Sequence, residues 1–380
     1  MTQIRSAQGQ VPLAQPNISD RERQLVAEVL AGDVLSMGPF TDRFEEAVAA
    51  LADRQFGVAC NSGTAGLHLA VAALGIGEGD QVITTPFSFV ASSNVMLYER
   101  AVPVFVDIEE ETLGLDPDRV EAAIGPRTRA ILPVDVFGHP CRLVEMEGIA
   151  SAHGLALIED SCEALGSRLD GRPLGSFGNA SVFAFYPNKQ ITTGEGGMLV
   201  TDDPQVAAAA RSMRNQGRDE DGTWLRHVRL GYNYRIDELS AALGLAQLER
   251  LDELRAGRDR VAAAYEELLG SQTWLRLPAV EPRAEVDWFV YVLQFAPEID
   301  RDRLIDQLAE DGVPARPYFS PIHLQPLYRE RFGFAEGDFP VTERVARSTL
   351  AIPFSSRLRD DQVDHVADAI LRAVHEQGVT

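Results

Sequence analysis

Short runs of apolar and β-branched residues alternate with helical patterns through the first half of this 380-residue chain. The apolar runs lie at residues 81–85, 102–107, 129–137 and 155–160, and helical patterns lie near 19–30, 41–53, 64–74, 88–98, 117–124 and 142–153. Strands that are buried on both faces have such apolar runs, and a helix is the usual connection between parallel strands. The alternation therefore predicts an α/β fold whose mostly parallel sheet is covered by helices.

The pattern changes after the runs at 181–185 and 197–201, which we predict as two further strands. Beyond them we predict a helical stretch, a strand, two helices and a Pro-rich loop, at about 237–269, 287–295, 301–311, 360–376 and 314–326. Such a mixture is typical of an α+β domain. We therefore predict a large α/β domain at residues 1–250, with ~15 residues of N-terminal arm, and a smaller C-terminal α+β domain at residues 251–380.

The chain carries 57 acidic and 35 basic side chains, which gives a formal net charge of −22. Nucleic acids and anionic membranes repel such a surface, so we expect neither as a partner. No apolar run approaches the roughly 18 residues of a membrane span, and the N-terminus lacks the pattern of a secretory signal. Three cysteines without a C-x-x-C pair disfavour a disulfide framework and a zinc site. We therefore expect a cytoplasmic protein without a bound metal.

Lys189 is the only lysine among the 35 basic residues, so the other 34 are arginines. Arginine can replace lysine in surface ion pairs, but only a primary amine can condense with an aldehyde. Composition alone is compatible with the chance survival of one surface lysine. The surroundings of Lys189 favour a chemical role instead.

Lys189 lies between two predicted strands in the segment FYPNKQITTGEGG. The glycines at 194, 196 and 197 allow the backbone to approach a ligand closely. This arrangement suits either phosphate binding or a covalent bond to an aldehyde. A Walker A loop is excluded, because the pattern G-x-x-x-x-G-K-[ST] is absent.

Three other segments place ligand-binding groups at predicted strand ends. Asp160 ends the run LALIED, where a carboxylate can pair with a pyridinium nitrogen or simply cap a loop. The helix that begins at Gly63 and Thr64 offers free N–H groups to a phosphate, although an ordinary N-cap is equally compatible. Phe87 and Phe89 follow a third strand, and either could stack on a planar ligand or pack in the core.

A lysine amine, a carboxylate, a phosphate cup and an aromatic face are together what pyridoxal 5'-phosphate (PLP) requires. An open α/β sheet brings the carboxyl ends of its parallel strands to one edge, so these segments can meet there. The sequence therefore predicts a PLP site.

From about Pro12 to Pro353 the chain resembles the DegT/DnrJ/EryC1/StrS family of sugar aminotransferases. The matching segments include LSMGPFTDRFE, CNSGTAGLHLA, IEDSCEALG, FYPNKQITTGEGG, LGYNYRIDELSAALGLAQL and RPYFSPIHLQPLY. The resemblance implies the aspartate aminotransferase architecture (PLP fold type I), with a sheet of the seven-stranded type in the large domain. It also implies a homodimer whose active sites are shared between the subunits.

The same resemblance implies a role for each matching residue. Lys189 would be the catalytic lysine that bonds to the cofactor, and Asp160 would meet the nitrogen of its ring. The other implied contacts are to the cofactor phosphate (Gly63 and Thr64), the ring face (Phe89), the phosphate in the neighbouring subunit (Asn233) and the sugar nucleotide (Tyr318 and His323).

Two positions depart from the pattern of the family. Glu163 stands where Gln or His is frequent, and we expect it to contact the cofactor all the same. Ala184 stands where a phosphate-binding Ser is frequent, five residues before Lys189. Ser181 precedes it by three residues on the same predicted strand, so its side chain is expected on the opposite face and is not expected to substitute.

The resemblance implies an aminotransferase of amino-sugar biosynthesis that moves an amino group from L-glutamate to a keto sugar. A nucleotide-linked 4-keto-6-deoxy sugar is the first choice of acceptor, and L-glutamine is the alternative donor. A keto-cyclitol of the scyllo-inosose type is the alternative acceptor. A non-catalytic PLP-binding regulator is disfavoured, because no helix-turn-helix pattern or basic stretch precedes the enzyme-like region.

Overall fold

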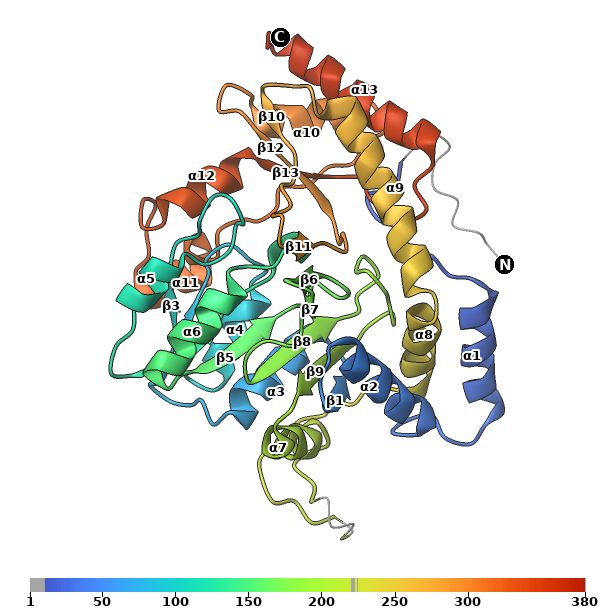
Figure 1. Ribbon diagram of the computed structural model, residues 1–380, viewed down its shortest axis with the longest axis vertical. Coiled ribbons are helices and arrows are strands. Elements are labelled where there is room, and N and C mark those ends of the chain that lie inside the picture. Colours follow the sequence, from blue (N-terminus) through green and yellow to red (C-terminus); the bar gives the residue numbers. More distant parts are fainter. Residues whose placement is uncertain (1–10, 220–222, 224, 380) are drawn as a thin grey trace.

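The computed structural model describes residues 11–219, 223 and 225–379, and a seven-stranded sheet lies at its centre (Figure 1). The strand order is β1-β9-β8-β5-β4-β2-β3. β9 is antiparallel to both of its neighbours, whereas the other neighbouring strands are parallel. The strands are β1 (Phe56–Cys60), β2 (Gln81–Thr84), β3 (Val102–Phe105), β4 (Thr128–Leu132), β5 (Ala156–Asp160), β8 (Ala180–Ala184) and β9 (Gly197–Thr201). The predicted α/β fold with a mostly parallel sheet is confirmed.

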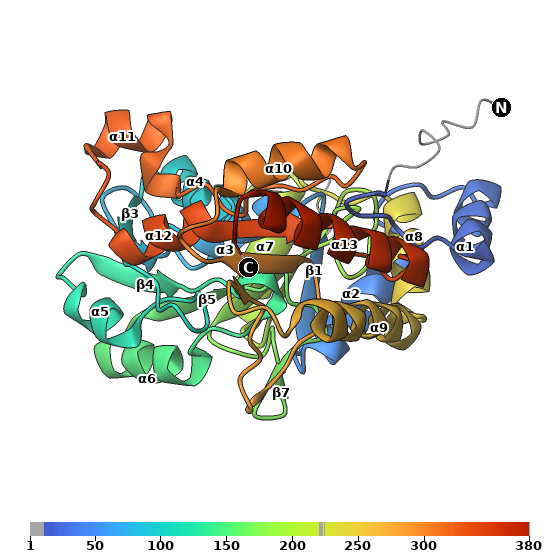
Figure 2. The ribbon, with the colours of Figure 1, turned by 90° about the horizontal axis from the view of Figure 1, so that it is seen from above.

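Helices cover both faces of this sheet. Alternate strand residues point to opposite faces and pack into different hydrophobic clusters. The covering helices are α2 (Pro39–Leu51), α3 (Gly63–Ala73), α4 (Ala91–Tyr98), α5 (Pro117–Ala122), α6 (Leu143–His153) and α7 (Pro204–Arg214). Ile158 of β5 packs in the cluster that contains α3, α4 and α7. Its neighbour Leu157 packs with α5 and α6 on the other face. Figure 2 shows α4 on one side of the strands and α5 and α6 on the other.

A second, antiparallel sheet of three strands lies in the C-terminal part, at the top of Figure 1. Its order is β10-β12-β13, and one apolar cluster joins it to α9, α10 and α13. The elements are α9 (Leu251–Leu269), β10 (Leu275–Arg276), β12 (Tyr291–Phe295), α10 (Arg301–Glu310), β13 (Thr349–Ile352) and α13 (Asp360–Glu376). This is the smaller α+β unit that the sequence predicts, whereas the boundary at residue 250 stays a prediction.

The remaining elements are short or peripheral. Three two-residue strands form a third sheet in the order β11-β6-β7. These elements are α1 (Asp20–Ala31), η1 (Val136–Gly138), β6 (Arg168–Leu169), β7 (Arg172–Pro173), α8 (Glu238–Leu248), β11 (Ala284–Glu285), η2 (Ile322–Leu324), α11 (Pro326–Phe332) and α12 (Pro340–Ser348). Within the described residues, no helix is both long and apolar enough to cross a membrane.

Three predicted elements differ from those in the structure by four residues or more. The strand predicted at 287–295 begins only at Tyr291. The strand predicted at 129–137 ends at Leu132, because Pro133 has no N–H to continue the ladder and the chain then turns through η1. The helical stretch predicted at 237–269 is two helices, α8 and α9. The break falls at Arg250, whose backbone leaves the helical region and whose guanidinium binds Glu22 on α1.

Candidate active site

The loops that follow β1, β2, β5 and β8 meet at one edge of the large sheet, around a cavity of about 490 Å³. Because these four strands run in the same direction, their carboxyl ends share that edge, where ligands of open α/β sheets bind. The C-terminal part contributes Phe289, Tyr318 and Phe319 to the wall. The predicted site residues that line the cavity are Gly63, Thr64, Phe89, Asp160, Glu163, Lys189 and Tyr318.

Lys189 lies on the loop between β8 and β9, and its amine points into the cavity. Its Nζ lies 3.2 Å from Glu163 Oε1 and 3.9 Å from the centre of the Phe289 ring. The other oxygen of Glu163 accepts a hydrogen bond from the backbone N–H of Phe137 (2.9 Å). The amine therefore lies in the site with a fixed proton acceptor beside it.

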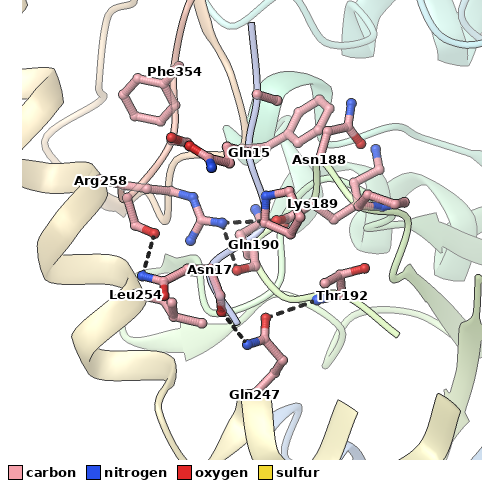
Figure 3. Close-up of a pocket in the computed structure, with 16 residues that line it drawn as sticks. Gln15, Asn17, Asn188, Lys189, Gln190, Thr192, Gln247, Leu254, Arg258 and Phe354 are labelled. Carbon is pink, nitrogen blue, oxygen red and sulfur yellow. Dashed lines mark hydrogen bonds between the residues drawn. The ribbon is translucent and has the colours of Figure 1, made fainter. Parts of the chain in front are cut away.

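The back of the Lys189 loop is anchored by two helices of the second half (Figure 3). Arg258 of α9 donates through Nη2 to the backbone oxygens of Lys189 (2.9 Å) and Gln190 (2.7 Å). Gln247 of α8 accepts from the N–H of Thr192 (3.3 Å). The cavity on this side has a volume of only about 10 Å³, about the space of one water molecule. A cofactor therefore fits only on the amine side of the loop.

Asp160 ends β5, and neighbouring groups fix its carboxylate. Ser92 Oγ donates to Oδ2 (2.7 Å), and the backbone N–H of Cys162 donates to Oδ1 (3.2 Å). Ser88 in turn lies 2.9 Å from Ser92, oxygen to oxygen. Asp160 is buried yet lines the cavity, so it can offer its carboxylate to a ligand without rotating.

The helix α3 begins at the cavity wall. The side chain of Ser62 caps the helix by accepting from the N–H of Ala65 (3.1 Å), and the first N–H groups, those of Gly63 and Thr64, have no acceptor within the helix. A Cβ on Gly63 would lie 2.6 Å from the Cβ of Ala184, so only glycine fits there. This helix end is open to an anion.

Ala184 and Ser181 lie on opposite faces of β8, as their spacing along the strand predicts. Ala184 lines the cavity. Ser181 is fully buried and donates to Glu159 Oε2 (2.7 Å). The hydroxyl of Ser181 therefore does not replace the serine that the family frequently has at the position of Ala184.

The two phenylalanines after β2 have different places. Phe87 is fully buried and packs edge-on against Phe137 and Phe319, so it belongs to the core. Phe89 leaves 61% of its surface exposed in the cavity wall and can cover a planar ligand. Tyr318 also lines the cavity, and burial, with a smaller contribution from Glu163, raises the pKa of its phenol.

The structure does not bring Asn233 and His323 to this cavity. Asn233 is exposed, and its backbone oxygen accepts from the side chain of Asn61 (3.3 Å). His323 is fully buried, with Nε2 3.1 Å from Glu343 Oε1 and its ring edge-on to Phe339. His323 therefore does not reach the cavity of its own chain, and its contact with a sugar nucleotide stays a prediction.

Sequence reasoning missed several residues of the site. Ser88 and Ser92 orient Asp160, and their spacing of four residues in the run PFSFVASSN is a signal that could have been used. Phe289 and Phe319 had no such signal, because their segments fold onto the site from the distant C-terminal part of the chain.

Comparison with known proteins identifies the family. The profile of the DegT/DnrJ/EryC1/StrS aminotransferase family matches residues 16–371. The chain belongs to this family. The GDP-perosamine synthase of Caulobacter vibrioides is 37% identical over 364 residues, which cover 95% of this chain and 97% of that protein.

Two solved structures are similar along almost their whole length. DesV of S. venezuelae is 33% identical, with a TM-score of 0.90, and the match covers 96% of this chain and 98% of DesV. DesI, determined in the presence of its TDP-sugar product, has the same identity and TM-score, with 98% and 95% covered. Members of the DegT/DnrJ/EryC1/StrS family are PLP-dependent aminotransferases, and this chain is one of them.

The cavity of this DegT/DnrJ/EryC1/StrS protein fits PLP. The open N-terminus of α3, with no side chain at Gly63, suits the phosphate, and Asp160 suits the ring nitrogen. Lys189 supplies the primary amine, and Phe89 supplies an exposed aromatic face. In the described part of the chain, no group of three or more potential ligands could hold a metal ion.

Proposed function

We propose that this enzyme transfers the amino group of L-glutamate to a nucleotide-linked 4-keto-6-deoxy sugar. One observation carries the proposal: the only lysine of the chain directs its amine into a cavity of about 490 Å³, beside the carboxylate of Glu163. An amine that has survived as the sole lysine, in a site that fits PLP, is the group that transamination requires.

PLP, when bound, supplies an aldehyde carbon that takes up the amino group and a ring that accepts electrons. Lys189 Nζ would take the proton from the Cα atom of the amino donor and hold it for the carbon that receives the amino group. Glu163 holds Nζ in place. Asp160 would keep a proton on the ring nitrogen, and the N–H groups of Gly63 and Thr64 would bind the phosphate.

A second cavity supports a large, two-part acceptor. It has a volume of about 430 Å³ and adjoins the first at Ser88, Phe89 and Phe319. A nucleotide-linked sugar would use both cavities, whereas a keto-cyclitol would leave the second one unused. The name of GDP-perosamine synthase and the TDP-sugar product of DesI also support a nucleotide-linked acceptor.

The proposal includes a homodimer with shared sites. Asn233 is exposed and does not line the cavity of its own chain. In the dimer it would reach the cofactor phosphate of the neighbouring subunit. Tyr318 would contact the sugar, and the buried His323 would support the loop that carries Tyr318.

A two-step assay tests the proposed function. L-glutamate or L-glutamine is first added to the yellow enzyme, and loss of the cofactor absorbance identifies the donor. GDP- and TDP-linked 4-keto-6-deoxy sugars, or scyllo-inosose, are then added, and the products are identified by mass. We expect an amino sugar nucleotide with L-glutamate. Amination of scyllo-inosose alone would favour the cyclitol alternative, and absence of donor-dependent bleaching would favour a regulator.

A further inference from the structure

Residue 287, just before β12, joins the two loops that carry the active-site groups. Its backbone oxygen accepts from Gln190 Nε2 (2.9 Å), next to Lys189, and its N–H donates to Ser167 Oγ (2.9 Å). Gln190 Nε2 also donates to the backbone oxygen of Glu163. The loops after β5 and β8 therefore share one hydrogen-bonded junction at Asp287.

The side chain at this junction is a buried carboxylate. Asp287 is fully buried, and neither of its oxygens has a hydrogen-bond partner among the described residues. It fits only because Gly166 lacks a side chain, since a Cβ there would lie 2.7 Å from Oδ2. A carboxylate in such surroundings is costly unless a nearby cation compensates it.

Arg258 of α9 is the main compensating cation. Its Nη2 binds the backbone oxygens of Lys189 and Gln190, and its Nη1 has no partner among the described residues. Arg255 adds a smaller attraction on Asp287, and Asp259 and Asp252 on the same helix oppose it. Burial raises the pKa of Asp287 to about 7, and burial also lowers the pKa of Arg258.

We propose that Arg258 is a positioning residue for Lys189. Its guanidinium holds the lysine loop by two backbone oxygens, and the backbone oxygen of Asp287 holds the side chain of the adjacent Gln190. Phe289, two residues after Asp287, then places its ring 3.9 Å from Lys189 Nζ. The C-terminal part thus sets both the backbone and the amine of the reactive lysine.

A purely structural role would predict a different result from the same substitutions. Buried charge pairs often contribute little net stability, and removal of one partner destabilises the fold wherever the pair lies. A positioning role requires that the surroundings of Lys189 change as well. Arg214 is the matched control, because it is equally buried, binds Glu45 and a backbone oxygen, and does not line the cavity.

The single lysine makes a direct measurement possible. Lysine labelled with ¹³C at Cε gives one side-chain signal in the full chain, which is recorded with the cofactor and after its removal. Arg258→Met should shift or broaden this signal, because the backbone oxygens of Lys189 and Gln190 lose their guanidinium donor.

The proposal rests on the proposed role of Lys189, but the signal from the cofactor-free chain does not depend on transamination. A Lys189 signal that is equal in the wild type, Arg258→Met and Arg214→Met would overturn the positioning role, even if enzyme activity fell. Arg258→Gln keeps an amide donor, adds no second lysine and loses the double contact, so it should give an intermediate signal. If Arg258→Met does not fold, Arg258→Gln decides the question, and a wild-type signal in that variant would contradict the proposal.

Discussion

Two carboxylates serve different groups in the cavity. Asp160 is fixed by Ser92 and by the backbone of Cys162 at a strand end, whereas Glu163 faces the amine of Lys189. Their surroundings differ although they are only three residues apart. Such different surroundings allow one carboxylate to hold a ring proton while the other receives a hydrogen bond from the reactive amine.

Substitution of Asp160 tests the first of these roles. Asp160→Asn keeps the shape but cannot keep a proton on the ring nitrogen, so the enzyme should still bind cofactor and lose at least about 100-fold in turnover. Asp135→Asn is the control, because Asp135 is a fully buried carboxylate that does not line the cavity. Wild-type turnover of Asp160→Asn would show that the ring-nitrogen role is wrong.

The departure at position 184 gives a prediction of improved binding. Ala184→Ser places a hydroxyl in the cavity wall near the start of α3, where it can donate to a phosphate. A hydrogen bond to a charged group contributes about 1.5–3 kcal/mol, so cofactor affinity should rise about tenfold or more. Titration of the cofactor-free protein with PLP measures the change. Ser181→Ala should leave this affinity unchanged, and equal effects of both variants would contradict the assignment of faces.

The order of strands, helices and loops along the chain explains what the sequence could reveal. Asp160 ends a strand of the sheet, and Lys189, Gly63 and Phe89 each follow one. A parallel sheet brings such strand ends together. Their meeting could therefore be predicted from pattern alone, and the family resemblance added their roles.

The contribution of the C-terminal part could not be predicted in this way. Phe289 and Arg258 reach the Lys189 loop through tertiary packing, and no local periodicity indicates which loop they meet. The same reason explains His323, whose motif matched the family although its ring packs beneath the surface. The break between α8 and α9 was missed because an ion pair of Arg250 with Glu22, 228 residues away, replaces the helical continuation.

The junction between α9 and the segment before β12 predicts a pH effect on stability. An aspartate has an ordinary pKa of 3.8, and burial raises the pKa of Asp287 to about 7 in the folded chain. The folded state therefore binds this proton more tightly. The resulting contribution of Asp287 to the free energy of unfolding is complete below about pH 4 and is lost as the pH rises through 7. Between pH 5 and pH 8 the loss should be about 2–3 kcal/mol.

Urea unfolding of wild type and Asp287→Asn at both pH values measures this contribution. The free energy of unfolding of the variant, relative to wild type, should increase between pH 5 and pH 8 because asparagine does not ionise. Asp364→Asn on the exposed face of α13 is the control and should not change the pH dependence. A constant difference between wild type and Asp287→Asn would show that Asp287 does not titrate in this range.

The surface of the whole chain suggests where a second copy binds. Leu225, Val228 and Leu230 are exposed close to Asn233 in the sequence, and Leu230 leaves 79% of its surface open. Leu35 and Met37, which precede α2, are also exposed. Exposed apolar side chains on an otherwise acidic chain favour a protein interface.

A complementation experiment tests whether the sites are shared. Lys189→Ala and Asn233→Ala should each be inactive or crippled. After subunit exchange, a mixed dimer would carry both lesions at one site and neither at the other, so about a quarter of all sites should regain function. Wild-type protein subjected to the same exchange is the control. No recovery despite verified exchange would indicate that each chain builds its own site.

The central claim is that Lys189 holds the cofactor, and chemical trapping tests it most directly. Borohydride reduction of the purified enzyme, followed by peptide mass mapping, should find a pyridoxyl group on the peptide that contains Lys189. Lys189→Arg keeps the positive charge but has no primary amine, so it should show neither the adduct nor amino transfer. An adduct at another position in the wild type, or full turnover by Lys189→Arg, would contradict the account.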